Sequence, residues 1–337
     1  MNLNAVWFVL IAVLFIGYFF LEGFDYGVGV LMPLIGRTDQ ERRAVVATIG
    51  PVWDANEVWL ITAGGAMFAA FPMWYATLFS GFYFPLSLLL VALIFRGVAL
   101  EFRSKEERKR WRAMWDGLIV FGSAVPPLIW GVAMANMLRG VPIDAHMNYV
   151  GGFWSLFNLY TVVGGVSALL LFGLHGALYL GLKAPDELQP RIRRIIYPIG
   201  AMATAAFFVF FVLTYFYTPV VSRIGLDPGV VPVLAGLAII SVRLLIQRNH
   251  FGWAFLANGV AIVLAVATVF TTLYPDVMPS SLDPAYSLTI YNSASNPYSL
   301  HVMTIVALSA LPFVLAYQAW SYWVFRKRVS LRDTFHY

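Results

Sequence analysis

The sequence contains no cysteine, and only 12% of its 337 residues are charged. Without cysteine the chain can form no disulfide, no thiolate metal site and no cysteine nucleophile. A water-soluble domain usually carries roughly a quarter charged residues, whereas here 60% of the residues are hydrophobic. The surface therefore has to face lipid. The net charge of +5 does not indicate a nucleic-acid partner, because the basic residues fall between the apolar stretches.

Apolar stretches of spanning length occur nine times along the chain. A spanning helix needs about 20 residues, and a backbone in lipid must satisfy its own hydrogen bonds. The sequence therefore predicts an all-α, polytopic bundle that forms one transmembrane domain over residues 1–337. The predicted helices cover residues 5–34, 46–70, 74–100, 114–137, 153–182, 197–220, 229–247, 252–273 and 299–325.

The placement of lysine and arginine predicts the orientation of these helices. If the amino terminus lies outside, 19 of the 22 basic residues fall in inner segments, including Arg332 in the tail. Arg139 and Arg223 fall outside, and Arg96 lies within a helix. This distribution follows the positive-inside rule, so the carboxyl terminus is expected in the cytoplasm.

Four carboxylates lie inside the first two predicted helices. Glu22 and Asp25 are three residues apart, as are Asp54 and Glu57, so each pair shares one helix face. Each buried charge costs about 2.5 to 3.5 kcal/mol on insertion scales. At 1.5 Å per residue, all four lie roughly 12 to 20 Å from the inner helix ends. Because the connecting loop is short, the two pairs are expected to face one another and to build a polar site.

Other polar residues in the predicted helices leave alternatives open. Arg96 is either a counter-ion for the acids or a side chain that extends to the headgroups. Asp116 is expected to be a solvated residue at a helix end, and Asn56 and Asn258 are expected to be polar packing groups. The carboxylates themselves are either hydrogen-bonded contacts between helices or groups that hold a proton, an ion or a quinol-type ligand.

Histidine is too scarce inside the helices for a haem held across the bundle. Only His175 lies clearly within a predicted helix, whereas bis-histidine haem needs two facing ligands. His175 is expected to be a buried histidine with a hydrogen-bond partner. The sequence also shows no phosphate-binding loop, nucleophile elbow or dinucleotide fingerprint in a supporting context. This chain is therefore expected to bind no cofactor and no metal by itself.

The polar stretches resemble subunit II of the cytochrome bd-type quinol oxidases of bacteria and archaea. The resemblance extends over the whole chain and is dense in its first third. It rests on the stretches FLEGFDYGVG at 20–29, ERRAVVATIGPVWDANEVWLITAGGAMFAAFP at 41–72, FSGFYFPLSLLLVALIFRGVALEFRSK at 79–105 and GLHGALYLGLK at 173–183.

The resemblance implies the composition and activity of a complex. A similarly folded subunit I would carry two b-type haems, one d-type haem and the quinol-oxidising loop. The complex would oxidise quinol and reduce dioxygen to water, taking protons from the cytoplasm and so generating a gradient without pumping. A small single-helix accessory subunit, membrane lipid and the prokaryotic cytoplasmic membrane are also expected.

The resemblance also implies the site residues. Asp25 and Asp54 match the family's acidic residues, and Asp54 beside Trp53 resembles the mouth of a proton path. Glu22 and Arg96 match motif positions, whereas the family pattern admits other polar residues at Glu57. The resulting hypothesis is a proton path through Asp54, with Asp25, Glu57 and Glu22 setting the local field.

Two other functions remain open at this stage. The alternative from another class is a proton- or ion-coupled transporter, whose site would lie at the midplane among broken helices. The chain shows no matching breaks in two halves, which argues against it. An inert assembly scaffold would tolerate neutralisation of all four carboxylates.

Overall fold

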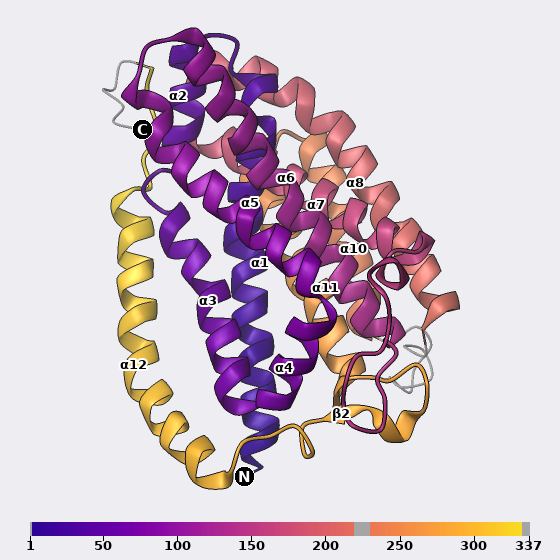
Figure 1. The fold of residues 1–337 in the computed structure, drawn as a ribbon. Helices are drawn as coiled ribbons and strands as arrows, with labels where there is room; N and C mark the ends of the chain where they lie inside the picture. The colour runs from indigo at the N-terminus through magenta and orange to yellow at the C-terminus, as the bar shows by residue number, and fades with distance from the viewer. Residues whose placement is uncertain (1, 219–229, 332–337) are drawn as a thin grey trace.

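The computed structural model describes residues 2–218 and 230–331. The described residues do not include Arg223, Arg332 or the ends of two predicted helices, residues 219–220 and 229. The long helices run side by side as one bundle (Figure 1). They are α1 (Leu3–Ile35), α3 (Trp53–Ala70), α5 (Tyr83–Phe102), α6 (Lys109–Arg139), α7 (Leu159–Lys183), α8 (Gln189–Tyr217), α10 (Val230–Gln247), α11 (Phe251–Leu273) and α12 (Pro297–Val324).

Eight helices in the described part of the chain are long and apolar enough to cross a membrane. The remaining predicted crossing, residues 46–70, corresponds to α3. Helix α3 is not among the eight because Asp54, Asn56 and Glu57 make its beginning polar. The predicted count of nine and the predicted orientation therefore stay predictions. The first and last helices, α1 and α12, run in the same direction (Figure 1), as an odd number of crossings requires.

Proline breaks two of the predicted helices into pieces. The predicted helix 46–70 covers only the last two residues of α2 (Asp39–Ala47), then a turn that contains Pro51, and then α3. The predicted helix 74–100 consists of α4 (Pro72–Gly81) and α5, with Pro85 in the first turn of α5. A proline has no N–H for the preceding turn, so a continuous helix is disfavoured at both places.

Helices α1 and α7 meet backbone to backbone at the centre of the bundle. A methyl group added at Gly176 would overlap main-chain atoms of Gly27 and Val28, and one added at Gly27 would overlap the carbonyl of Phe172. Small residues at such crossings let helices in a bilayer pack by close van der Waals contact. This contact places α1, which carries Glu22 and Asp25, against the interior of the bundle.

The end of the bundle that is predicted to be outer consists of loops held by short backbone pairings. Strands β1 (Asp276–Met278) and β2 (Leu288–Thr289) pair antiparallel, and Val141 exchanges backbone hydrogen bonds with Pro279 and Ser281. The segment between the predicted helices 252–273 and 299–325 therefore contains a small antiparallel strand pair, although the fold is all-α as expected.

A network of ion pairs closes the end of the bundle that is predicted to be inner, called the inner end below, which carries α2 and the connection between α5 and α6. Asp116 accepts hydrogen bonds from Arg42 at 2.7 Å and from Arg103 at 2.5 Å. Asp116 is only 6% exposed, so the prediction of a solvated helix-end residue was wrong. Arginines from α2 and from the end of α5 converge on this carboxylate and exclude water from it.

Glu41 is expected to make the stability of the inner end depend on pH. A hydrogen bond from Arg191 at 2.7 Å, helped by the N–H groups of Arg37 and Thr38, lowers the pKa of Glu41 from 4.5 to about 2. Because the pKa is lower in the folded state, this stabilisation is present above pH 4.5 and is lost as the pH falls toward about 2. The Glu41→Gln variant should show a flatter fall of its thermal midpoint over this range. An unchanged slope would show that Glu41 contributes nothing.

Candidate functional site

The centre of the site is an ion pair between α1 and α5. Arg96 Nη1 contacts Glu22 Oε1, and neither side chain has any exposed surface. The Arg96 guanidinium also lies over the ring of Tyr26, 4.9 Å from the centroid. Of the two alternatives for Arg96, the structure shows the counter-ion, since a side chain that extended to the headgroups would not be fully buried.

Asp25 lies one helical turn after Glu22 and has a different partner. Asn56 Nδ2 on α3 donates a hydrogen bond of 2.7 Å to Asp25 Oδ2, and both residues are fully buried. Asn56 in turn accepts hydrogen bonds from Tyr322 at 2.7 Å and from Gln318 at 3.4 Å, both on α12. Three helices therefore meet at one amide.

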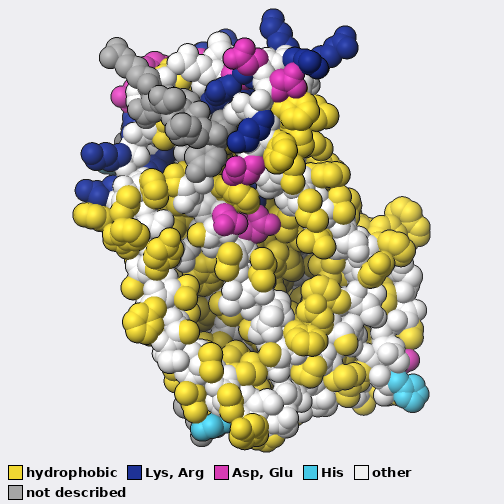
Figure 2. All heavy atoms as spheres, turned by 60° about the vertical axis from the view of Figure 1, so that its left-hand side comes forward, with side chains coloured by type: hydrophobic (Ala, Val, Ile, Leu, Met, Phe, Trp, Pro, Cys, Tyr) yellow, Lys and Arg dark blue, Asp and Glu magenta, His cyan; other side chains and the backbone are white. Residues whose placement is uncertain are grey.

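The second predicted pair joins this site only in part. Glu57 Oε2 lies 4.0 Å from Arg96 Nη1, and its side chain is 19% exposed. Asp54 is exposed, and Trp53 is half-buried against Gly97 on α5. Because Asp54 and Asn56 are two residues apart, they point about 200° apart around α3. On the face that carries α3 and α12, acidic side chains emerge below the basic inner end among hydrophobic ones (Figure 2).

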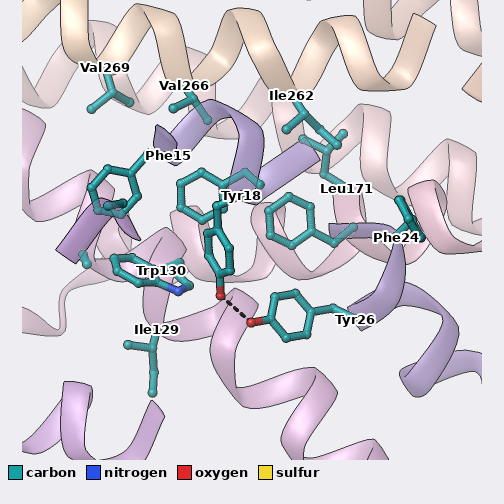
Figure 3. Close-up of a cluster of buried hydrophobic side chains, with 14 of the residues drawn as sticks. Phe15, Tyr18, Phe24, Tyr26, Ile129, Trp130, Leu171, Ile262, Val266 and Val269 are labelled. Carbon is teal, nitrogen blue, oxygen red and sulfur yellow. Dashed lines mark hydrogen bonds between the residues drawn. The ribbon is translucent and has the colours of Figure 1, made fainter. Parts of the chain in front are cut away.

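A pair of tyrosines covers the other side of the ion pair. The hydroxyls of Tyr18 and Tyr26, both fully buried on α1, are hydrogen-bonded to each other (Figure 3). Trp130 packs edge-on against Tyr18, with 6.1 Å between the ring centroids. The Tyr26 ring thus covers the Arg96 guanidinium, and Tyr18 and Trp130 continue the aromatic packing beside it.

Several polar atoms of the site have no hydrogen-bond partner among the described residues. They are Glu22 Oε2, Asp25 Oδ1, Glu57 Oε2, Arg96 Nε and Arg96 Nη2. Buried polar atoms are nearly always paired, either with protein or with water. The arrangement can therefore bind protons or water between Asp25, which is held by Asn56, and the two carboxylates that lie against Arg96.

His175, the one histidine clearly inside a predicted helix, is held by contacts with other residues of the chain. His175 is fully buried, its Nε2 lies 3.1 Å from the carbonyl of Phe20, and its ring stacks on Phe255 with 4.4 Å between centroids. Both the stacked face and this nitrogen are occupied by protein. Within residues 2–218 and 230–331, no cluster of three or more His, Asp or Glu side chains could hold a metal ion.

The sequence identified the acids of the site but missed several of their partners. Asn56 was expected only to pack helices, although its place between Asp54 and Glu57 was a signal that it shares their environment. Tyr322 and Gln318 gave no signal, because α12 is far away in the sequence. Tyr18 and Tyr26 could not be distinguished from the many other aromatic residues.

Comparison with known proteins supports one family. The model of the family described as cytochrome bd terminal oxidase subunit II matches residues 3–325. The chain is 44% identical over 336 residues to cytochrome bd ubiquinol oxidase subunit 2 of Bacillus subtilis (strain 168), covering 100% of this chain and 99% of that protein. It is 36% identical over 365 residues to cytochrome bd-I ubiquinol oxidase subunit 2 of Escherichia coli (strain K12), covering 98% and 96%.

A solved structure has a similar fold. The bd oxidase from Geobacillus thermodenitrificans matches with a TM-score of 0.75 at 16% sequence identity, covering 96% of this chain and 99% of that chain. At this level of identity the likeness concerns the fold alone.

The fold and the site together define a multi-pass membrane protein with a charged cluster inside its helix bundle. Within that class, the family match and the sequence identities show that the chain belongs to the cytochrome bd terminal oxidase subunit II family. It is therefore a subunit of an oxidoreductase that works in complex with a subunit I, and the family implies that haem is carried by that partner.

Proposed function

We propose that this chain is the haem-free second subunit of a quinol:oxygen oxidoreductase, and that it conducts protons from the cytoplasm toward the partner's oxygen-reducing site. The observation that carries the proposal is the buried cluster of Glu22, Asp25 and Arg96, with Glu57 at its edge. The same chain stabilises subunit I. The family assignment leaves no specific support for the transporter alternative.

The finer features of the complex follow from the family resemblance. The relatives named as ubiquinol oxidases support a quinol as the reductant. Subunit I would carry two b-type haems and one d-type haem, and dioxygen would be reduced to water without proton pumping. A small single-helix subunit and lipid would complete the complex in the cytoplasmic membrane of a prokaryote.

Charge balance supports a proton in the buried cluster. Glu22 and Asp25 are two carboxylates without exposed surface, and Arg96 supplies one positive charge. A second negative charge without a partner would be costly in the membrane interior. A proton shared by Glu22 and Asp25 cancels that charge, and it would also pair Glu22 Oε2 with Asp25 Oδ1.

The exposure of the acids supports an order along the path. Asp54 is exposed, Glu57 is partly buried and Glu22 is fully buried. Asp54 and Glu57 are one helical turn apart on α3, and Glu57 reaches Arg96. In this scheme Asp54 receives the proton at the surface beside Trp53, and Glu57, Glu22 and Asp25 set the field along which it moves.

Asparagine substitutions test this path. We expect Asp25→Asn and Asp54→Asn to lower quinol oxidase turnover per haem by on the order of tenfold or more, because each removes a group that exchanges protons. Proton uptake should fall in parallel while the haem content stays normal. Glu107→Gln, which alters an exposed inner-end carboxylate, is the matched control.

Full turnover and full proton uptake in both aspartate variants would contradict the proton path. If neutralising all four carboxylates lowers only the amount of assembled complex, the chain is a scaffold. Turnover per haem separates these results, because it does not depend on the yield of complex.

A further inference from the structure

Two hydrogen bonds in series connect α12 to the carboxylate of Asp25. The Tyr322 hydroxyl donates to Asn56 Oδ1 at 2.7 Å, and Asn56 Nδ2 donates to Asp25 Oδ2 at 2.7 Å. We propose that Asn56 and Tyr322 are positioning residues that decide which oxygen of Asp25 holds a proton. This inference rests on the proposed proton-conducting role of the carboxylates.

The direction of the Asn56 amide is determined by its neighbours. An asparagine amide presents a donor on one side and an acceptor on the other, in nearly the same shape. The Trp59 indole, which can only donate, bonds Gln318 Oε1 at 2.9 Å, so Gln318 turns its NH₂ group toward Asn56 Oδ1 at 3.4 Å. Tyr322 donates to the same oxygen. The NH₂ group of Asn56 must therefore face Asp25.

The two carboxylate oxygens of Asp25 therefore differ in their hydrogen bonding. Oδ2 always has an amide donor, whereas Oδ1 has no hydrogen-bond partner among the described residues. The proton therefore resides on Oδ1. Asn56 orients the carboxylate and does not relay the proton, because an amide N–H that released its proton would no longer be an amide.

Tyr322 lies at the boundary between the inner end and the buried site. It lines a cavity of about 220 Å³ together with Tyr179 on α7 and Thr48 and Pro51 in the turn before α3. Only Leu300 of α12 is buried, so polar bonds such as those of Tyr322 and Gln318 hold this helix against the site. Tyr322, which orients the Asn56 amide, is thus accessible through this cavity at the inner end.

The test compares substitutions of Tyr322 and Asn56 with a control on α12 in the assembled oxidase. Tyr322→Phe removes the donor to Asn56, and Asn56→Leu removes the whole bridge. Tyr317→Phe is the matched control, because Tyr317 is 65% exposed on the same helix. We expect Asn56→Leu to lower turnover per haem roughly tenfold and Tyr322→Phe to lower it less, in proportion to the bonds removed.

The pH profile of turnover separates positioning from a structural role. We expect its midpoint to shift in Tyr322→Phe and Asn56→Leu, with the KM for quinol and the haem content unchanged. The titratable and charged groups packed around Asp25 are Glu22 and Tyr26 on α1, Glu57 on α3, Arg96 on α5, Tyr179 on α7 and Tyr322 on α12. Adding Tyr322→Phe to Asp25→Asn should cause no further shift if the shift belongs to Asp25.

Three outcomes would overturn the inference. They are an unchanged profile in both variants, a uniform loss of turnover at every pH without a shift, and a further shift in the Asp25→Asn background. If Asn56→Leu does not assemble, the pH profile of Tyr322→Phe, which leaves Asn56 and Gln318 in place, decides the comparison. Full activity of Asp25→Asn would instead refute the proposed function itself.

Discussion

Glu22→Gln is expected to destabilise the folded subunit by about 3–5 kcal/mol, the usual cost of leaving one partner of a buried ion pair without the other. Arg96 would keep its charge with no exposed surface. Glu57 lies 4.0 Å from the same nitrogen but is partly exposed, and Asp25 is hydrogen-bonded to Asn56, so neither carboxylate replaces Glu22 completely. The loss should be measured as a lower thermal midpoint and a lower yield of assembled complex.

A double-mutant cycle tests whether this loss comes from the pair. Glu22→Gln combined with Arg96→Gln should be more stable than Glu22→Gln alone, because no unpaired charge remains in the bundle. Glu22→Gln combined with Glu57→Gln should be less stable than either single variant. If the effects of Glu22→Gln and Arg96→Gln simply add, the ion pair is not the source of the stability.

Gly176→Ala is expected to separate α1 from α7. The new methyl group would overlap main-chain atoms of Gly27 and Val28, and backbone in the middle of two packed helices cannot turn aside as a side chain can. Inserting a methyl group into a packed interior typically costs about 1–3 kcal/mol. Since α1 carries Glu22 and Asp25, turnover per haem should fall together with the thermal midpoint.

Gly173→Ala is the matched control for this packing prediction. It places the same methyl group on the same helix three residues earlier, where nothing lies within 4 Å. We expect its thermal midpoint to equal that of the unsubstituted protein, or to exceed it, because alanine favours a helix more than glycine does. Equal stability of the two alanine variants would show that the contact between Gly27 and Gly176 is not tight.

Hydrophobicity predicted most of the helices, whereas the orientation inferred from charge placement stays a prediction. Long apolar stretches can only be helices in lipid, so seven of the predicted crossings overlap one long helix each, such as 252–273 with α11 (Phe251–Leu273). The predicted helix 153–182 began too early, because a separate 3-10 helix (Phe153–Leu156) precedes α7. The break at Pro51 and the break between α4 and α5, which precedes Pro85, were missed. Proline is common enough in membrane helices that it does not by itself mark a helix end. The burial of Asp116 was missed because its arginine partners come from other helices.

The sequence by itself determined that Glu22 and Asp25 share a helix face inside an apolar stretch, since helical periodicity and hydrophobicity are local properties. Only the tertiary structure decided their partners. Arg96 is 74 residues from Glu22, Asn56 is 31 residues from Asp25, and Tyr322 is 266 residues from Asn56. The tertiary structure also places Asp54 on the surface and not beside Glu22. Which atoms meet across helices depends on how each helix is rotated against its neighbours, and close contacts such as that of Gly27 with Gly176 fix this rotation in the folded bundle.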